Sequence, residues 1–347
     1  MNIISKILKF FVTVVLMAVG FEMFLGATEI SMPSFVDYYK EVGRTFKPNT
    51  DIIAFNEGFY LGKSNEYGYL GPAYPPEKPD SVVRIVLIGD SFVEGMQLFE
   101  RMHFRSILEN ELRKLFGDKV QVLNFGRAGS DLRSEFVYLK NFAYKFDPDY
   151  VLFFIGASSF YRIDKNPNPL PVISGDSLII DSSYWYSKEM QERRRYSFLR
   201  NLPSFALIKK SIKLIKSGKV MPLIFGKFYD LFAGNPDDEK SGQEMIFGEK
   251  KEDKYSEINI RIIEELGRMN NDKKILVVLR DKIPGKYLSK IKSEGLRTVG
   301  LNDYLDNLKR KGFDPTFWET TKTHGHWNAE AHKLIGNYLA KILKQEL

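Results

Sequence analysis

The sequence predicts an α/β fold in which a parallel β-sheet is covered by helices on both faces. Short apolar runs rich in β-branched residues alternate with longer segments whose apolar residues recur every three or four positions. Several of the short runs end in Gly, Asp or Ser, as buried strands do where the chain turns into a helix. This alternation is typical of parallel sheets that are buried on both faces.

The predicted elements follow one another from about residue 81 onward. The first strand, at 83–88, ends abruptly in Gly89-Asp90-Ser91, and Gly95 follows four residues after the serine. A helix is predicted at 103–116, where five apolar residues share one face. Further strands are expected at 120–125, 150–155 and 275–279, with a weak one at 297–301, and further helices at 132–142, 255–269 and 329–343.

The first 30 residues read as a membrane segment. Lys6 and Lys9 precede an apolar stretch at 10–27 that is interrupted by Glu22 alone and approaches the roughly 20 residues needed to span a bilayer. Lysines before the stretch predict that the main domain lies outside the cytoplasm. A cleaved signal peptide is the competing interpretation, but Leu25-Gly26-Ala27 is a poor cleavage site, which favours an uncleaved single-pass anchor.

Two further regions lie outside the regular alternation. Residues 31–80 are rich in Tyr, Gly, Pro and Asn and are predicted to form an extended arm before the domain at 81–347. An insertion at about 160–254 separates the third and fourth strands and contains a basic, amphipathic segment at 205–216. This segment is either a helix that touches a membrane or an acidic polymer, or an ordinary surface helix with a solvated lysine face.

Composition excludes several functions. The chain of 347 residues contains no cysteine, so disulfides and thiolate metal sites are excluded. The net charge of +7 is spread among interspersed acidic residues, and no basic stripe with aromatic platforms predicts a nucleic-acid partner. His324, His326 and His332 could form a metal site with three imidazole ligands, but no acidic cluster accompanies them, so neither a metal nor another cofactor is expected.

Candidate catalytic residues follow the predicted strands. Ser91 stands at the carboxyl end of the first strand, where ligands bind in α/β sheets, and is either a nucleophile or the cap of the next helix. Gly129 lies in a glycine-containing turn after the second strand, where backbone amides can approach an oxyanion. Ser158 follows the third strand and could donate to the same oxyanion. His326, in a loop before the last helix, could reach Ser91 as its base.

In this order, these motifs resemble the conserved blocks of the SGNH/GDSL hydrolases. The resemblance covers about residues 80–160 and 270–345, and rests on Gly89-Asp90-Ser91 with Gly95, on the turn at 124–129, on 156–159 and on 326–332. It implies a flavodoxin-like three-layer α/β/α sandwich. It also implies Ser91 as nucleophile and His326 as general base, with the Ser91 amide, the Gly129 amide and the Ser158 side chain as the oxyanion hole.

Two positions depart from the family pattern. The third block has Ser158 where the family has Asn, and one oxyanion donor is worth about 3 kcal/mol. The family places an Asp two or three residues before the histidine, but Thr323 and His324 stand there. His324 is therefore a possible orienting group, and Asp314 or Glu319 are the nearby acids that could replace the missing Asp.

The resulting prediction is a membrane-anchored, extracytoplasmic serine esterase. Its substrate is expected to be an acyl or acetyl ester of a cell-surface glycan or lipid, attacked by Ser91 to give an acyl-enzyme. A polysaccharide O-acetyltransferase would use the same centre and differ in what accepts the acyl group. A catalytically impaired binding or scaffold protein of the same fold is the third possibility, because two supports of the serine are substituted.

Overall fold

The computed structural model describes residues 3–216 and 255–347, except residues 56 and 165. The chain divides into two compact units. The first contains the N-terminal residues as far as Ser34 together with the described residues from Tyr186 onward to Lys216, and the second contains Phe35–Trp185 and the described residues from 255 onward. The rest of the predicted insertion, 217–254, lies outside the described residues.

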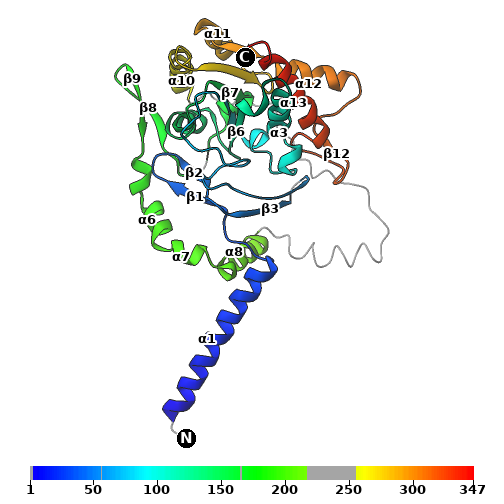
Figure 1. The fold of residues 1–347 in the computed structure, drawn as a ribbon. Helices are drawn as coiled ribbons and strands as arrows, with labels where there is room; N and C mark the ends of the chain where they lie inside the picture. Colours follow the sequence, from blue (N-terminus) through cyan, green and yellow to red (C-terminus); the bar gives the residue numbers. More distant parts are fainter. Residues whose placement is uncertain (1–2, 56, 165, 217–254) are drawn as a thin grey trace. The chain divides into compact units, whose positions relative to one another are not determined.

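The second unit is built on a five-stranded sheet (Figure 1). Its strands are β5 (Val83–Gly89), β6 (Val120–Gly126), β7 (Tyr150–Ile155), β10 (Lys274–Leu279) and β11 (Arg297–Val299). They are all parallel and lie in the order β11-β10-β7-β5-β6. Read from β6 to β11, with the five strands numbered along the chain, this order is 2-1-3-4-5, which is the flavodoxin-like arrangement. The predicted fold class is confirmed.

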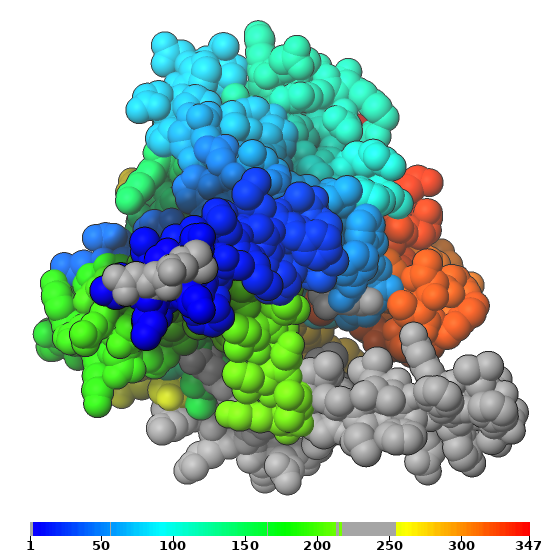
Figure 2. Space-filling model, turned by 90° about the horizontal axis from the view of Figure 1, so that it is seen from below, coloured from blue at the N-terminus to red at the C-terminus, as the bar shows by residue number. Residues whose placement is uncertain are grey.

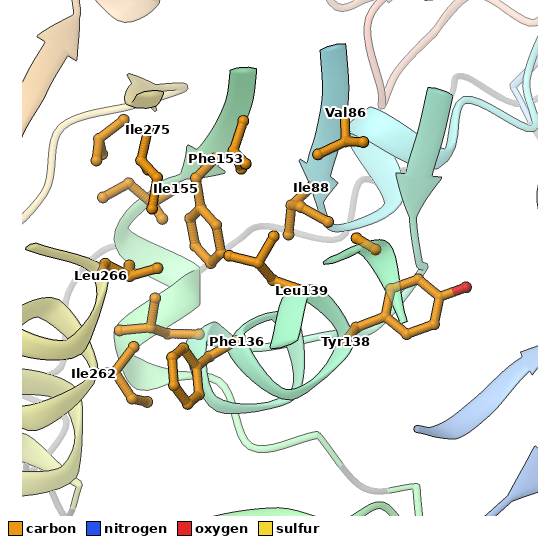
Figure 3. Close-up of a cluster of buried hydrophobic side chains, with 14 of the residues drawn as sticks. Val86, Ile88, Phe136, Tyr138, Leu139, Phe153, Ile155, Ile262, Leu266 and Ile275 are labelled. Carbon is orange, nitrogen blue, oxygen red and sulfur yellow. The ribbon is translucent and has the colours of Figure 1, made fainter. Parts of the chain in front are cut away.

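One face of the sheet is covered by α4 (Leu132–Asn141), α10 (Ser256–Met269) and α11 (Gly285–Ser293). Figure 3 shows side chains of α4 and α10 packed against alternate residues of β5 and β7, such as Ile88 and Phe153. The residues between them face the other way, because successive side chains of a strand point to opposite faces.

The opposite face is covered by α3 (Phe104–Phe116), α12 (Leu301–Arg310) and α13 (Ala329–Leu343). Ile85 and Leu87 of β5 are fully buried against this layer. Burial on both faces explains why the sheet strands read as continuous apolar runs rather than as alternating ones.

Several elements were absent from the sequence-based prediction. Helix α11 was not predicted, and neither was α12, whose first residue, Leu301, ends the predicted weak strand early. The arm contains two antiparallel hairpins, with strands β1 (Val36–Tyr39), β2 (Gly43–Phe46), β3 (Asp51–Phe55) and β4 (Phe59–Lys63). The remaining strands and helices of this unit are α2 (Ser91–Glu94), α5 (Ala157–Tyr161), β8 (Leu170–Ser174), β9 (Ser177–Asp181), β12 (Phe317–Trp318) and β13 (Thr323–His324), with short 3₁₀ turns at 100–102, 117–119, 143–146 and 183–186.

The first unit contains four helices in its described part. They are α1 (Ile3–Thr28), α6 (Lys188–Arg195), α7 (Ser197–Arg200) and α8 (Pro203–Lys216). Helix α1 is long and apolar enough to cross a membrane, a property that it shares with signal sequences.

Gly95 ends α2 in a left-handed conformation, with φ of 69°, and a Cβ there would lie 2.1 Å from the His103 ring. We expect Gly95→Ala to lower the free energy of unfolding by the roughly 1–2 kcal/mol of a left-handed alanine plus about 1–3 kcal/mol for displacing that ring. The control is Gly295→Ala, which has the same φ and no atom within 4 Å of the added Cβ. The free energy of unfolding of both variants is measured with urea. If both lose the same amount relative to the wild type, the contact with the His103 ring does not explain why residue 95 is glycine.

Candidate active site

Ser91 lies at the carboxyl edge of the sheet where the strand order reverses. It follows β5, whose neighbours are β6 and β7, and this switch point is where ligands bind in open α/β sheets. Ser91 is the first residue of α2, but it does not cap the helix. The cap is Asp90, whose Oδ1 accepts from the Phe92 amide at 3.1 Å. The Ser91 hydroxyl is therefore left for another partner.

That partner is His326. Its Nε2 lies 2.8 Å from Ser91 Oγ. The loop that carries it is fixed by the Trp318 indole, which donates to the His326 carbonyl at 2.8 Å, and by the Gly325 amide, which donates to the Thr316 carbonyl at 3.0 Å. The Phe92 ring packs against the imidazole with 4.7 Å between ring centres. The histidine predicted from the sequence therefore reaches the predicted serine.

The carboxylate behind His326 is Glu57, which lies between β3 and β4 at the turn of an arm hairpin. Its Oε1 lies 2.9 Å from His326 Nδ1, and the Glu57 and His326 side chains are 18% and 24% exposed. Burial works to raise the pKa of Glu57, but the hydrogen bonds from His326 and from its own backbone outweigh it and lower the pKa. Glu57 is therefore ionised at neutral pH.

An ionised carboxylate only accepts hydrogen bonds, so His326 Nδ1 carries the proton and Nε2 is the free acceptor. This tautomer is the one that a base needs in order to take the Ser91 proton. Glycine makes the approach possible, because a Cβ on Gly325 would lie 2.2 Å from Glu57 Oε1. The hydroxyls of Thr320 and Thr321 hold the turn by donating to the Glu57 carbonyl at 3.3 Å.

The nearby groups suggested by the sequence have other partners. His324 is exposed on β13, and its Nε2 lies 3.1 Å from Asp314 Oδ2. Glu319 pairs with Lys322. The orienting position that the sequence suggested for His324, Asp314 or Glu319 is filled by Glu57, because the loop turns the His326 Nδ1 toward the arm rather than toward its own neighbours in sequence.

The Gly129 turn lies beside the end of β5. The Arg127 amide donates to the Gly89 carbonyl at 3.0 Å, and the Ala128 amide donates to Glu94 Oε1 at 3.0 Å. Gly129 has φ of 86°, which favours glycine. Among the described residues no hydrogen bond is recorded from the Ser91 or Gly129 amides. These two amides are the donors that the resemblance assigns to an oxyanion hole.

Ser158 lies in the first turn of α5, next to the end of β7, and is bound to a buried cation. Arg280 Nη2 donates to Ser158 Oγ at 2.7 Å, and Nη1 donates to Asp90 Oδ2 at 2.5 Å. The guanidinium is 9% exposed and also lies over the Phe92 ring. Burial works to raise the pKa of Asp90, but the charge and hydrogen bond of Arg280 outweigh it and lower the pKa. Because Ser158 Oγ accepts from Arg280, its own proton stays available to another acceptor.

A buried carboxyl group lies beneath the Gly129 turn. Glu135 Oε1 accepts from Ser130 Oγ at 2.9 Å, and the Ser130 hydroxyl also contacts the Arg127 carbonyl at 2.9 Å. Burial, together with the negative charge of Asp90, raises the pKa of Glu135 to about 8. Glu135 is therefore mostly protonated at neutral pH and adds little negative charge near the proposed oxyanion site.

The other two histidines are buried structural residues. His332 Nδ1 accepts from the Phe104 amide at 3.1 Å, and His103 Nδ1 accepts from the Arg105 amide at 3.0 Å, which caps α3. Burial lowers the pKa of both, that of His103 to about 3. The three histidines of the alternative metal site, His324, His326 and His332, have separate partners. No group of three or more metal-ligating side chains occurs in residues 3–216 and 255–347 as far as they are described.

Two site residues escaped the sequence-based prediction. Glu57 stands between two β-type runs, 51–55 and 59–63, and such a pattern predicts a hairpin but not what its turn will contact. Arg280 follows a predicted strand directly, so its place at the carboxyl edge of the sheet was readable, although its bond to Ser158 was not.

Comparisons with known proteins give weak similarity. No family model and no curated protein matches the chain. Among solved structures, a lipase/acylhydrolase from Enterococcus faecalis is 12% identical with a TM-score of 0.37, covering 77% of this chain and 97% of its own. The acetyl xylan esterase AlAXEase is 10% identical with a TM-score of 0.39, covering 75% and 100%. A catalytic mutant of an acetylxylan esterase from Geobacillus stearothermophilus is 12% identical with a TM-score of 0.39, covering 76% and 95%.

We expect Glu135→Gln to stabilise the protein increasingly as the pH rises. The raised pKa means that the folded protein holds a proton that the unfolded chain loses above about 4.5, so the wild type loses stability between pH 4.5 and 8. The free energy of unfolding of the variant should exceed that of the wild type by almost nothing at pH 4 and by about 3–5 kcal/mol at pH 8. Urea unfolding across this range measures it, with Glu330→Gln on the exposed surface of α13 as control. A pH-independent difference for Glu135→Gln would exclude a proton held on that group.

Proposed function

We propose that this protein is a serine ester hydrolase of the SGNH/GDSL type whose catalytic triad is Ser91, His326 and Glu57. The observation that carries the proposal is the continuous chain of two hydrogen bonds, of 2.8 Å and 2.9 Å, that joins the serine to the histidine and the histidine to an ionised carboxylate. A non-catalytic binding protein would have no need of these two consecutive hydrogen bonds, which argues against the scaffold alternative.

In the proposed reaction, Ser91 Oγ attacks the ester carbonyl carbon while His326 Nε2 takes the hydroxyl proton. Glu57 stabilises the imidazolium without becoming protonated. The tetrahedral intermediate collapses as His326 gives its proton to the leaving alkoxide, and the acyl group stays on Ser91. Water, deprotonated by His326, then attacks the acyl-enzyme and releases the carboxylic acid and the free serine.

Three donors are proposed to stabilise the oxyanion: the Ser91 amide, the Gly129 amide and the Ser158 hydroxyl. Arg280 would strengthen the third donor, because a hydroxyl that accepts a bond from a guanidinium is a stronger donor through its own proton. This charge-assisted serine replaces the longer asparagine of the family pattern. Arg280 is thus a positioning residue that acts through Ser158.

The substrate proposed is an acyl or acetyl ester of a cell-surface glycan or lipid. Its support is the position of α1, which we propose to be a membrane anchor. Lys6 and Lys9 at its start favour the cytoplasmic side for that end and the outer side for the domain. An enzyme held there meets esters of the membrane and of the envelope.

Removing triad members should separate their roles. We expect Ser91→Ala and His326→Ala to lower kcat for p-nitrophenyl acetate by about 10⁴-fold or more, and Glu57→Gln by about 10²–10⁴-fold with little change in KM. A fluorophosphonate probe should label the wild type but not Ser91→Ala.

The control for Glu57 is Asp314→Asn, which removes the carboxylate beside His324 and should leave kcat within about twofold. If the wild type neither hydrolyses the ester nor reacts with the probe, the esterase proposal fails. If Asp314→Asn impairs the enzyme as much as Glu57→Gln, the triad is assigned to the wrong acid.

Ser158 and Arg280 should act as one unit. We expect Ser158→Ala to lower kcat by about 10²-fold, in line with one lost oxyanion donor. Because Arg280 is proposed to act through Ser158, the double variant Ser158→Ala/Arg280→Met should be no slower than Ser158→Ala alone. In the presence of Ser158, Arg280→Lys should recover part of the kcat that Arg280→Met loses. The control, Ser159→Ala, alters a neighbouring hydroxyl that contacts the Gly156 amide. If the fold-loss in kcat of the double variant equals the product of the two single losses, Arg280 does not act through Ser158.

A further inference from the structure

The positive charge of this chain is concentrated in the helices of its first unit. The segment 188–216, which forms α6, α7 and α8, contains nine lysine or arginine residues and two glutamates. Its net charge therefore equals the +7 of the entire chain. The catalytic proposal uses none of these residues.

Helix α8 also exposes an apolar stripe. Ile208, Ile212 and Ile215 recur at intervals of four and three residues, which places them on one side of the helix, and they are 57%, 48% and 66% exposed. At 100° per residue, Lys210 lies about 160° around the helix from both Ile208 and Ile212. Lys209 and Lys216 flank the stripe, about 60° and 40° from Ile212. Figure 2 shows α8 as the yellow-green segment, with its side chains at the surface. An exposed apolar stripe with lysines beside and opposite it is the pattern of helices that lie in a lipid interface, where lysines extend to the head groups.

A hydrogen-bonded contact joins α8 to α1. Ser204, in the first turn of α8, donates to the Glu22 carboxylate both through its backbone amide, at 3.2 Å, and through its hydroxyl. A carboxylate at this place satisfies amides that the first turn of a helix leaves unpaired, and the helix dipole favours it. Leu25, one turn beyond Glu22, is the buried residue of α1. The polar interruption of the apolar segment thus holds the start of α8.

The contact sets the depth of α8. Glu22 follows Lys9 by 13 positions, which is about 20 Å along a helix, whereas the hydrocarbon core of a bilayer is about 30 Å thick. If Lys9 marks one boundary, Glu22 lies in the outer part of the core, and α8 starts near the opposite boundary. An interfacial helix buries its apolar face about 5–10 Å into that boundary.

From this geometry we infer that α8 lies on the outer surface of an anionic bilayer, with its isoleucines among the acyl chains and its lysines at the head groups. The inference rests on the proposed membrane insertion of α1. A free acidic polymer would match the lysines but not the isoleucine stripe, so a lipid surface is the better fit to both.

The absence of cysteine from the chain makes the test direct. Single-cysteine variants of the full-length protein, Ile212→Cys, Lys210→Cys and Val15→Cys, are labelled with an environment-sensitive fluorophore in vesicles of phosphatidylcholine with about one third phosphatidylglycerol. We expect a lipid-borne quencher to act at least about threefold more strongly at Ile212 than at Lys210, and aqueous iodide to show the reverse preference. Val15, within α1, should respond to the lipid quencher alone.

A second set of variants tests the charge. Adding Lys210→Glu and Lys216→Glu to Ile212→Cys should reduce lipid quenching at least about threefold, and vesicles of phosphatidylcholine alone should do the same to the unmodified sequence. Equal lipid quenching at Ile212 and Lys210, with Val15 quenched, would overturn the placement of α8 and leave the anchor standing. Loss of quenching at both Val15 and Ile212 would overturn both. If lipid quenching at Ile212 is the same with and without the lysine-to-glutamate substitutions and the phosphatidylglycerol, the requirement for anionic lipid is overturned.

Discussion

The hydrogen bond between Glu57 and His326 is the contact on which the proposed chemistry depends. It joins a hairpin of the arm to the loop before the last helix, across 269 positions of the chain. It selects the tautomer of His326 that leaves Nε2 facing Ser91, and it requires the close approach that Gly325 permits. The sheet supplies the edge on which the serine stands, but the sheet alone does not supply a base that is held in the correct orientation.

The surroundings of four carboxyl groups around this edge shift their pKa values in opposite directions. Asp90 and Glu57 contact Arg280 and His326, and their pKa values are lowered. Burial raises the pKa values of Glu94 and Glu135, that of Glu135 to about 8. The raised pKa of Glu135 lets the site hold this acidic group without adding much negative charge where an oxyanion would form. At the two departures from the SGNH/GDSL pattern, at Ser158 and before His326, we propose that Arg280 and Glu57, which come from other segments, supply the missing support.

The sequence was informative wherever a local pattern determines the structure. Apolar periodicity gave the strands of the sheet and most of the helices that cover it, and turn residues placed Ser91, Gly129 and Ser158 at one edge. Local sequence pattern did not predict the role proposed for Glu57, because the sequence of a hairpin does not show which distant segment its turn will contact. It failed also for α12, where Leu301 begins a helix two residues after β11 and the apolar run continues across the boundary. Long-range docking and short connections are both tertiary properties, and single-sequence periodicity does not contain them.

The three residues of the proposed triad come from distant segments, and this has a consequence for when the proposed activity could first arise. Glu57 leaves the ribosome early, Ser91 soon after, and His326 only near the end of synthesis, so the three meet only after the sheet has closed and the last helix has docked. Contacts this far apart in sequence form late, because the chain must first lose the freedom of the long loops between them. The nascent chain would therefore lack the proposed centre, and the proposed ester cleavage would begin only once the whole second unit had folded.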